Sequence, residues 1–154
     1  MKNKLITFII TYFFLSSFAF SQEFIFKTKK IEITENGKFI NAAFGTVSSD
    51  DGDLKISANE FKYNKNKNVL EIYGNGIIFI KSQDLEIFFK KSIIDRKNLT
   101  IQADGSVKIL DKKRNLKIIS ESIFYDQQEN IIKSESRTEI EDGNQNYYLV
   151  DKFF

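Results

Sequence analysis

Acidic residues are the main candidates for chemistry in this 154-residue chain, because its sequence contains no His and no Cys. That composition excludes thiol nucleophiles, Ser-His pairs, disulfides, and zinc or haem sites with His or Cys ligands. The densest acidic cluster is Asp50-Asp51-Gly52-Asp53, which resembles part of a calcium loop but lacks the spaced ligands and terminal Glu of an EF-hand. Asp and Gly are also the residues that turns select, so the cluster predicts a hairpin turn and no metal site.

Paired carboxylates of the glycosidase kind would need two acids that face one cleft. Four glutamates lie in stretches where apolar and polar residues alternate, and each occupies the polar phase: Glu60, Glu71, Glu86 and Glu121. A solvated outer face is the expected position for all of them. The sequence has no nucleophile motif either, so it predicts a protein that is not an enzyme and needs no cofactor.

Alternation of apolar and polar residues continues along most of the chain after its first segment, as in Ile31-Glu32-Ile33 and Val107-Lys108-Ile109. A period of two residues is typical of half-buried strands, and β-branched and aromatic side chains suit a pleated surface. Runs such as Glu35-Asn36-Gly37 and Glu141-Asp142-Gly143-Asn144 supply turn residues between them. The pattern predicts one all-β domain over residues 22–154.

A repeat of about 31 residues organises the expected strands. Leucine begins three similar stretches at this spacing, with isoleucine two positions later: Leu54 and Ile56, Leu85 and Ile87, Leu116 and Ile118. A second strand carries small residues two positions apart and recurs after 31, 29 and 33 residues: Ala43-x-Gly45, Gly74-x-Gly76, Ala103-x-Gly105 and Ser136-x-Thr138. Repeats of this length predict stacked β layers, each built from two strands.

Each repeat also contains a change of phase. Leu54 and Ile56 lie on one face of an extended strand, whereas Phe61 has the opposite parity. One extra residue at Asn59-Glu60 would bring all three to the same face, which predicts a β-bulge that turns the strand around a corner. The same change recurs in the next two repeats, at Lys90-Lys91 and at Glu121-Ser122.

The first segment has the pattern of a secretory signal peptide, residues 1–21. Lys2 and Lys4 precede an uncharged run that ends in Ala19-Phe20-Ser21, with small residues at the expected cleavage site. An uncleaved anchor is the alternative, although the run of seventeen residues would only just span a bilayer core that needs about 20. Cleavage removes two of the 23 basic residues and leaves 21 against 21 acidic ones, so no basic excess favours nucleic-acid binding.

Several stretches of the repeat carry a resemblance to a known family. They are Leu54 to Tyr63, with the pattern L-x-I-x-A-x-x-F-x-Y, its echo ending Ile123-Phe124-Tyr125-Asp126, and the strands Asn68 to Gly74 and Asn130 to Ser136. Over about residues 24–154 the chain resembles the periplasmic lipopolysaccharide-transport proteins of the LptA/OstA type. Their fold also forms the N-terminal domain of the outer-membrane lipopolysaccharide-assembly protein. Ser134 to Gly143 looks most like that domain just before its barrel begins.

The resemblance implies a twisted, open β-jellyroll whose facing sheets enclose an apolar trough. It also implies a non-catalytic conduit in the periplasm, associated with the outer membrane, in which acyl chains of lipopolysaccharide lie in the trough and the sugars stay outside. The inward phase supplies the residues expected to line the trough: Ile56, Ala58, Phe61, Leu70, Ile72, Ile78, Ile87, Phe89, Leu99, Ile101, Val107, Ile118 and Ile123. The alternative is a structural or adhesive β-repeat module in which the same residues form only a packed core.

The last expected strand, Tyr147-Tyr148-Leu149-Val150, is apolar and contains no Pro. Such an edge is free to pair with another chain. We expect it to join other jellyroll-domain proteins of the transport bridge by strand addition. A barrel needs many strands of about 9 to 11 residues, so we expect either a free bridge subunit or a domain that precedes a barrel. The ending at Phe153-Phe154 favours truncation.

Overall fold

Residues 24–154, which the computed structural model describes, form one ten-stranded antiparallel sheet and contain no α-helix. Seven long strands come first: β1 (Phe24–Thr34), β2 (Phe39–Ser49), β3 (Leu54–Asn64), β4 (Val69–Ile80), β5 (Leu85–Asp95), β6 (Thr100–Asp111) and β7 (Leu116–Asp126). Three short strands follow: β8 (Ile131–Lys133), β9 (Thr138–Glu141) and β10 (Tyr147–Val150). Single 3₁₀ turns, η1 (Glu35–Gly37) and η2 (Lys81–Gln83), join β1 to β2 and β4 to β5. The prediction of an all-β domain is confirmed.

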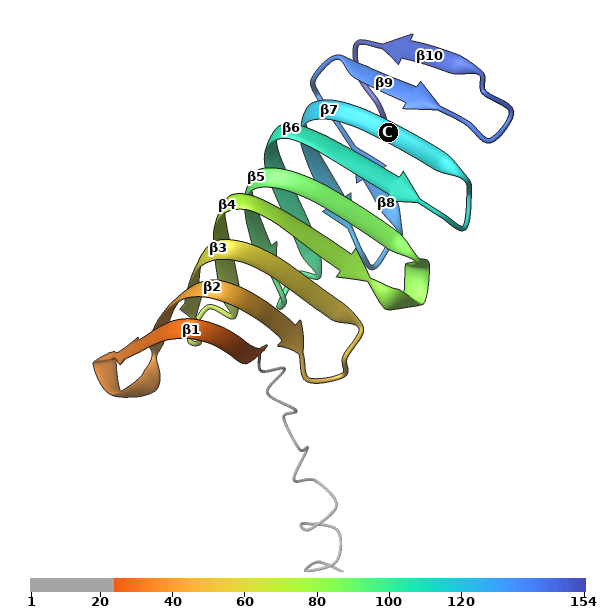
Figure 1. The fold of residues 1–154 in the computed structure, drawn as a ribbon. Helices are drawn as coiled ribbons and strands as arrows, with labels where there is room; N and C mark the ends of the chain where they lie inside the picture. The colour runs from red at the N-terminus through yellow and green to blue at the C-terminus, as the bar shows by residue number, and fades with distance from the viewer. Residues whose placement is uncertain (1–23) are drawn as a thin grey trace, which may run out of the picture.

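From β1 to β7 the strands follow one another in the sheet in chain order, so the fold is a meander coiled into an arch (Figure 1). The described residues hold no helix that is long and apolar enough to cross a membrane. The predicted signal peptide, residues 1–21, lies outside the part of the chain that the structure describes.

The long strands bend near their middle, where the pairing register changes. Between Ser57 and Glu60 of β3, the paired residues of β4 run from Ile77 to Tyr73, so β4 contributes one residue more than β3. The extra residue lies in the Gly74–Gly76 stretch, where Gly74 and Asn75 have φ values of 80° and 47°. Glycine and asparagine tolerate this left-handed conformation, which a bulge requires.

The same bulge recurs on β6, where Gly105 and Ser106 have φ values of 85° and 54° and the register shifts between Asp104 and Val107. The predicted bends are therefore present, but the predicted position of the extra residue was wrong. It lies on the strands with the small-residue pattern and not at Asn59-Glu60, Lys90-Lys91 or Glu121-Ser122. Those stretches pair opposite the bulges. The buried positions change there from even to odd numbers, or the reverse, because the partner strand bends at the bulge.

Each bend divides the sheet into two arms. We call the part containing residues 45–57, 76–88 and 107–120 arm A, and the part containing residues 60–73, 91–104 and 122–133 arm B. The eighth strand is interrupted at the bend: β8 pairs with the arm B half of β7, and β9 pairs with the arm A half. The two facing sheets expected from the family are thus the two arms of one continuous sheet.

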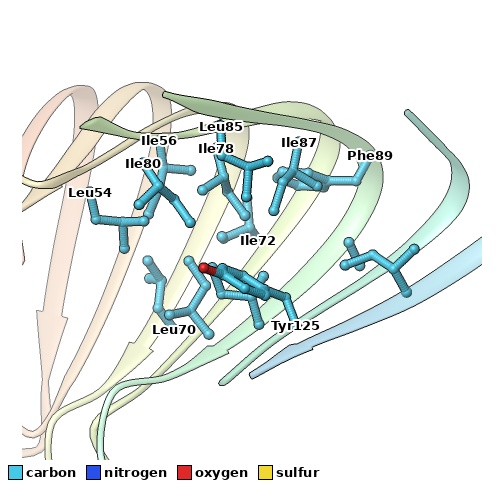
Figure 2. Packing of buried hydrophobic residues seen from close by; sticks show 14 of the residues in the cluster. Leu54, Ile56, Leu70, Ile72, Ile78, Ile80, Leu85, Ile87, Phe89 and Tyr125 are labelled. Carbon is cyan, nitrogen blue, oxygen red and sulfur yellow. The ribbon is translucent and has the colours of Figure 1, made fainter. Parts of the chain in front are cut away.

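Inward side chains of the two arms meet in a single apolar core. In β3, Leu54 and Ile56 come from arm A and Phe61 and Tyr63 from arm B, and all four are buried. Figure 2 shows the two layers, with Ile78 and Leu85 on one side and Leu70 and Tyr125 on the other. One face of each strand from β2 to β7 therefore closes on this core, as the alternation predicts.

The turns at the free ends of the arms stack on one another. We call the turns 50–53, 81–84 and 112–115 rim A, and the turns 65–68, 96–99 and 127–130 rim B. Successive turns are joined by backbone hydrogen bonds. Examples are Lys81 N to Asp53 O at 2.9 Å in rim A and Arg96 N to Asn68 O at 3.0 Å in rim B. The acidic cluster at 50–53 forms the predicted turn, closed by Gly52 N donating to Ser49 O at 3.0 Å.

Candidate functional site

A continuous row of apolar side chains crosses every layer of arm A. Strand pairing aligns its members in order: Phe26, Val47, Ile56, Ile78, Ile87, Ile109, Ile118, Ile140 and Tyr148. A second row crosses arm B in the same way: Ile33, Ile40, Tyr63, Leu70, Ile94, Ile101, Tyr125 and Ile132. The two rows face each other and form an apolar track from one edge strand to the other.

Most residues expected in the trough lie in this core. Eleven of the thirteen are buried: Ile56, Phe61, Leu70, Ile72, Ile78, Ile87, Phe89, Ile101, Val107, Ile118 and Ile123. Ala58 is half-buried and packs against the same cluster. Leu99 is placed differently, in a rim B turn at φ 54° and outside the core cluster. The alternating sequence pattern includes Leu99, but β6 begins one residue later, at Thr100. Leu99 occupies the turn position that Asn68 and Asn130 occupy in the neighbouring repeats, both with φ 55°.

The interior is filled in the middle of the sheet and hollow at its C-terminal end. Ile78, Leu85 and Ile87 have no exposed surface. At the end of the arch a cleft of about 590 Å³ is lined by Asp111, Arg114, Leu116, Ile118, Asn130, Ile131, Ile132, Lys133, Phe153 and Phe154. Its volume lies in the range of about 300–1,000 Å³ that is usual for small-molecule sites.

Charged and apolar side chains line this cleft together. The Asp111 side chain is buried and accepts hydrogen bonds from Arg114 N at 2.8 Å and Arg114 Nε at 2.5 Å. The Arg114 side chain is itself half-exposed at 49%, and Lys133 is exposed. The cleft can therefore accommodate a molecule with an apolar body and an anionic end.

Buried hydroxyls interrupt the apolar interior at the last bend, a feature absent from the sequence prediction. Ser134 Oγ lies 2.8 Å from Ser120 Oγ, and Thr138 Oγ1 donates to Ser120 Oγ at 3.0 Å. Because the eighth strand is interrupted here, some backbone groups lack a hydrogen-bond partner in a neighbouring strand. Ser134 Oγ takes the place of such partners by donating to Ser122 O and accepting from Ser136 N. The replacement of Ala and Gly by Ser136-x-Thr138 in the last repeat was the available signal.

Tyr125, which the sequence analysis named only as part of a repeat motif, also brings a polar group into the interior. Its ring is buried, and its hydroxyl donates to Gln83 Oε1 on rim A and lies 3.2 Å from Asn130 Oδ1. Burial raises the pKa of the Tyr125 hydroxyl above its ordinary value of 10.0. The group therefore stays protonated and remains a donor at neutral pH.

Both edge strands expose the ends of the apolar track. On β10, the predicted partner edge, Tyr147, Tyr148 and Leu149 are exposed, whereas Val150 is half-buried. On β1, Ile31 and Ile33 are exposed, although their cross-strand partners belong to the inward face. Each edge strand pairs on one side only, with β9 and β2 respectively.

The structure is similar to the crystal structure of LptH, the LptA-homologous periplasmic component of the lipopolysaccharide transport device of Pseudomonas aeruginosa. The TM-score is 0.64 at 14% sequence identity, over 84% of this chain and 94% of LptH. The fold is an LptA-like β-jellyroll. No model of a protein family matches the sequence, and no curated protein does. The predicted jellyroll fold is therefore confirmed by geometry.

The open jellyroll explains why the site is a track and not a closed pocket. A sheet that coils without closing leaves two mouths, and here the C-terminal mouth contains the cleft. Within the described residues, no group of three or more acidic side chains is arranged to hold a metal ion. The arrangement is suited to binding an extended apolar molecule by burial.

Proposed function

We propose that this protein is a non-catalytic periplasmic conduit that binds lipopolysaccharide and passes it toward the outer membrane. The observation that supports this most strongly is the apolar track, which crosses every strand and ends in exposed side chains at both edges. The fold likeness to LptH, a periplasmic component of a lipopolysaccharide transport device, supports the same function.

The physical basis is burial of acyl chains. Moving one methylene group out of water is worth roughly 0.8 kcal/mol, so a track of Ile, Leu and Phe side chains can hold a chain that would otherwise face solvent. Lipid headgroups would remain at the rims, where Arg114 lines the cleft with its side chain half-exposed. A passive track equalises chemical potential along its length, and direction must be supplied by a partner.

The edges suggest how the track is extended. The outer side of β10 carries unpaired backbone groups next to Tyr147, Tyr148 and Leu149, which are exposed, and edge strands of this kind accept an added strand. We propose that other jellyroll domains of the transport bridge pair here, with the chain acting as a bridge subunit or as the entry domain of the outer-membrane assembly protein. Export by the segment 1–21 is part of the same proposal.

A structural or adhesive module is the second candidate, favoured by the complete burial of residues such as Ile87 in the middle of the core. Photocrosslinking separates the two. A benzophenone amino acid at Ile118, which lines the cleft, should crosslink to purified lipopolysaccharide. The same probe at the next residue, Ile119, should not crosslink, because the Ile119 side chain points outward and is 36% exposed. Equal labelling at both positions, or none at Ile118, would favour the structural module.

A further inference from the structure

One arginine spans the open side of the jellyroll. Arg96 belongs to rim B, yet its Nη2 lies 3.6 Å from Asp51 Oδ2 and 4.0 Å from Asp50 Oδ1, both on rim A. Its guanidinium carbon lies 5.9 Å from the centre of the Phe24 ring. The Arg96 side chain is only 7% exposed, so this cation is held between the two arms.

Two further contacts join the arms in the same region. The Tyr125 hydroxyl, from arm B, donates to Gln83 on rim A. The rings of Phe24, on β1, and Tyr63, in arm B, meet edge to face with centroids 5.1 Å apart. The free ends of the arms are therefore fastened along the packed part of the core.

The hollow end lacks an equivalent fastening among the described residues. Arg114 lies 31 residues after Gln83 and so occupies the corresponding position of the next repeat. Its guanidinium pairs with Asp111 in the same arm and makes no ion pair with the other arm. The cleft opens at this level, so the presence or absence of a contact between the rims coincides with a closed or an open interior.

The charges of the rims are complementary where the arms are fastened. The rim A turn 50–53 carries three aspartates, and the facing rim B turns 65–68 and 96–99 carry lysine and arginine. Asp50 and Asp51 remain 40% and 52% exposed while Arg96 is buried. Water can therefore solvate the two carboxylates as the contact breaks, which makes this a fastening that can be released.

We infer that Arg96, with Asp50 and Asp51, forms a latch between the rims, and that an acyl chain reaches the middle of the track only when the latch opens. The inference rests on the proposed function for the identity of its cargo. The latch itself is a property of the fold and can be measured without lipid.

The first test measures the distance between the rims. Spin labels at Lys81→Cys on rim A and Lys97→Cys on rim B are unique, because the chain has no cysteine, and both lysines are exposed. Pulsed electron resonance should give one narrow distance in the parent and a longer or broader distribution with Arg96→Gln. Arg114→Gln, a matched change in the rim A turn 112–115, which makes no ion pair with rim B, should leave the distance unchanged.

An unaltered distance in Arg96→Gln would overturn the latch. If that variant fails to fold, as circular dichroism would show, the double variant Asp50→Asn and Asp51→Asn provides the same measurement from the exposed side of the latch. A parent-like distance in the double variant would equally overturn it.

The second test locks the rims together. A cleavable bismaleimide joining Cys residues at positions 81 and 97 should reduce uptake of purified lipid A at least tenfold, and cleavage should restore it. Equal uptake by the locked and released chains would overturn the latch. Absence of uptake by the released chain would overturn the conduit function instead, while the spin-label distances would still decide whether the rims are fastened.

Discussion

The middle of the sheet and its C-terminal end are built from the same 31-residue repeat, but the middle is packed and the end is hollow. In the middle, bulges at Gly74–Gly76 and at Gly105 keep each strand continuous around the bend. At the end the eighth strand breaks into β8 and β9, and hydroxyls of Ser134 and Thr138 replace ladder bonds. Small changes at the bend of a repeat thus decide whether a layer is packed or open.

The largest expected difference concerns matched truncations in the two regions. Ile87→Ala in the packed middle removes side-chain atoms that have no exposed surface and should lower the free energy of unfolding by about 3 kcal/mol. Ile131→Ala at the cleft, where the side chain is 38% exposed, should lower it by less than about 1 kcal/mol. Urea denaturation measures both, and equal effects would contradict the contrast in packing.

Added volume should show the same contrast. A Cβ at Gly76 would lie 2.3 Å from the ring of Phe89 in the packed core, so Gly76→Ala should destabilise the fold by about 2 kcal/mol. A Cβ at Gly143 would lie 2.2 Å from Asn115 Nδ2, which is the end of an exposed side chain that can move away. Gly143→Ala should therefore change stability by less than about 0.5 kcal/mol. Thermal melts of the two variants check this, and similar losses would show that the end is as rigid as the middle.

The hydroxyl cluster at the broken strand should make a smaller contribution. Ser134→Ala leaves Ser122 O and Ser136 N without their bonds to Ser134 Oγ, which should reduce the free energy of unfolding by about 1–2 kcal/mol. Ser57→Ala, at an exposed position, is the control and should have almost no effect. Parent-like stability of Ser134→Ala would show that water replaces the hydroxyl freely.

The smallest effect is expected from acid. Hydrogen bonds from the Ser49 hydroxyl and from Asp53 N, together with the charge of Arg96, hold the pKa of Asp51 below its ordinary value of 3.8. A carboxyl whose pKa is depressed on folding stabilises the fold above its unfolded value, and that stabilisation is lost as pH falls through its folded value. Asp51→Asn should therefore show a shallower loss of stability than the parent below about pH 4. Identical pH profiles of stability would show that the ionised Asp51 carboxylate does not stabilise the fold.

The bend illustrates how much the sequence could predict. The parity change between Ile56 and Phe61 was visible because inward positions of a strand must be apolar, and it located the corner. It could not say which strand holds the extra residue, because a bulge depends on pairing between strands. The left-handed residues Gly74 and Asn75 mark the bulge, and only the pairing register shows that β4, and not β3, holds the extra residue.

The site shows a similar limit. Apolar rows could be predicted from periodicity, but Arg96 lies in a charged turn and Asp111 lies at the end of β6 beside another, where burial is not expected. Both are buried because the arms coil toward each other and bring distant turns together. For Leu99 the prediction was wrong in the opposite sense. This apolar residue was expected inside the trough as part of a strand, but the chain turns at Leu99.

The most direct test of the central claim is methyl NMR of isoleucine during titration with purified lipid A. The chain carries inward isoleucines at the cleft, including Ile118 and Ile132, and outward ones at Ile77 and Ile119. We predict that the methyl signals at the cleft shift first, that those of Ile87 and Ile78 follow, and that Ile77 and Ile119 stay unchanged. Shifts confined to the outward residues, or none at saturating lipid, would contradict a conduit along the interior.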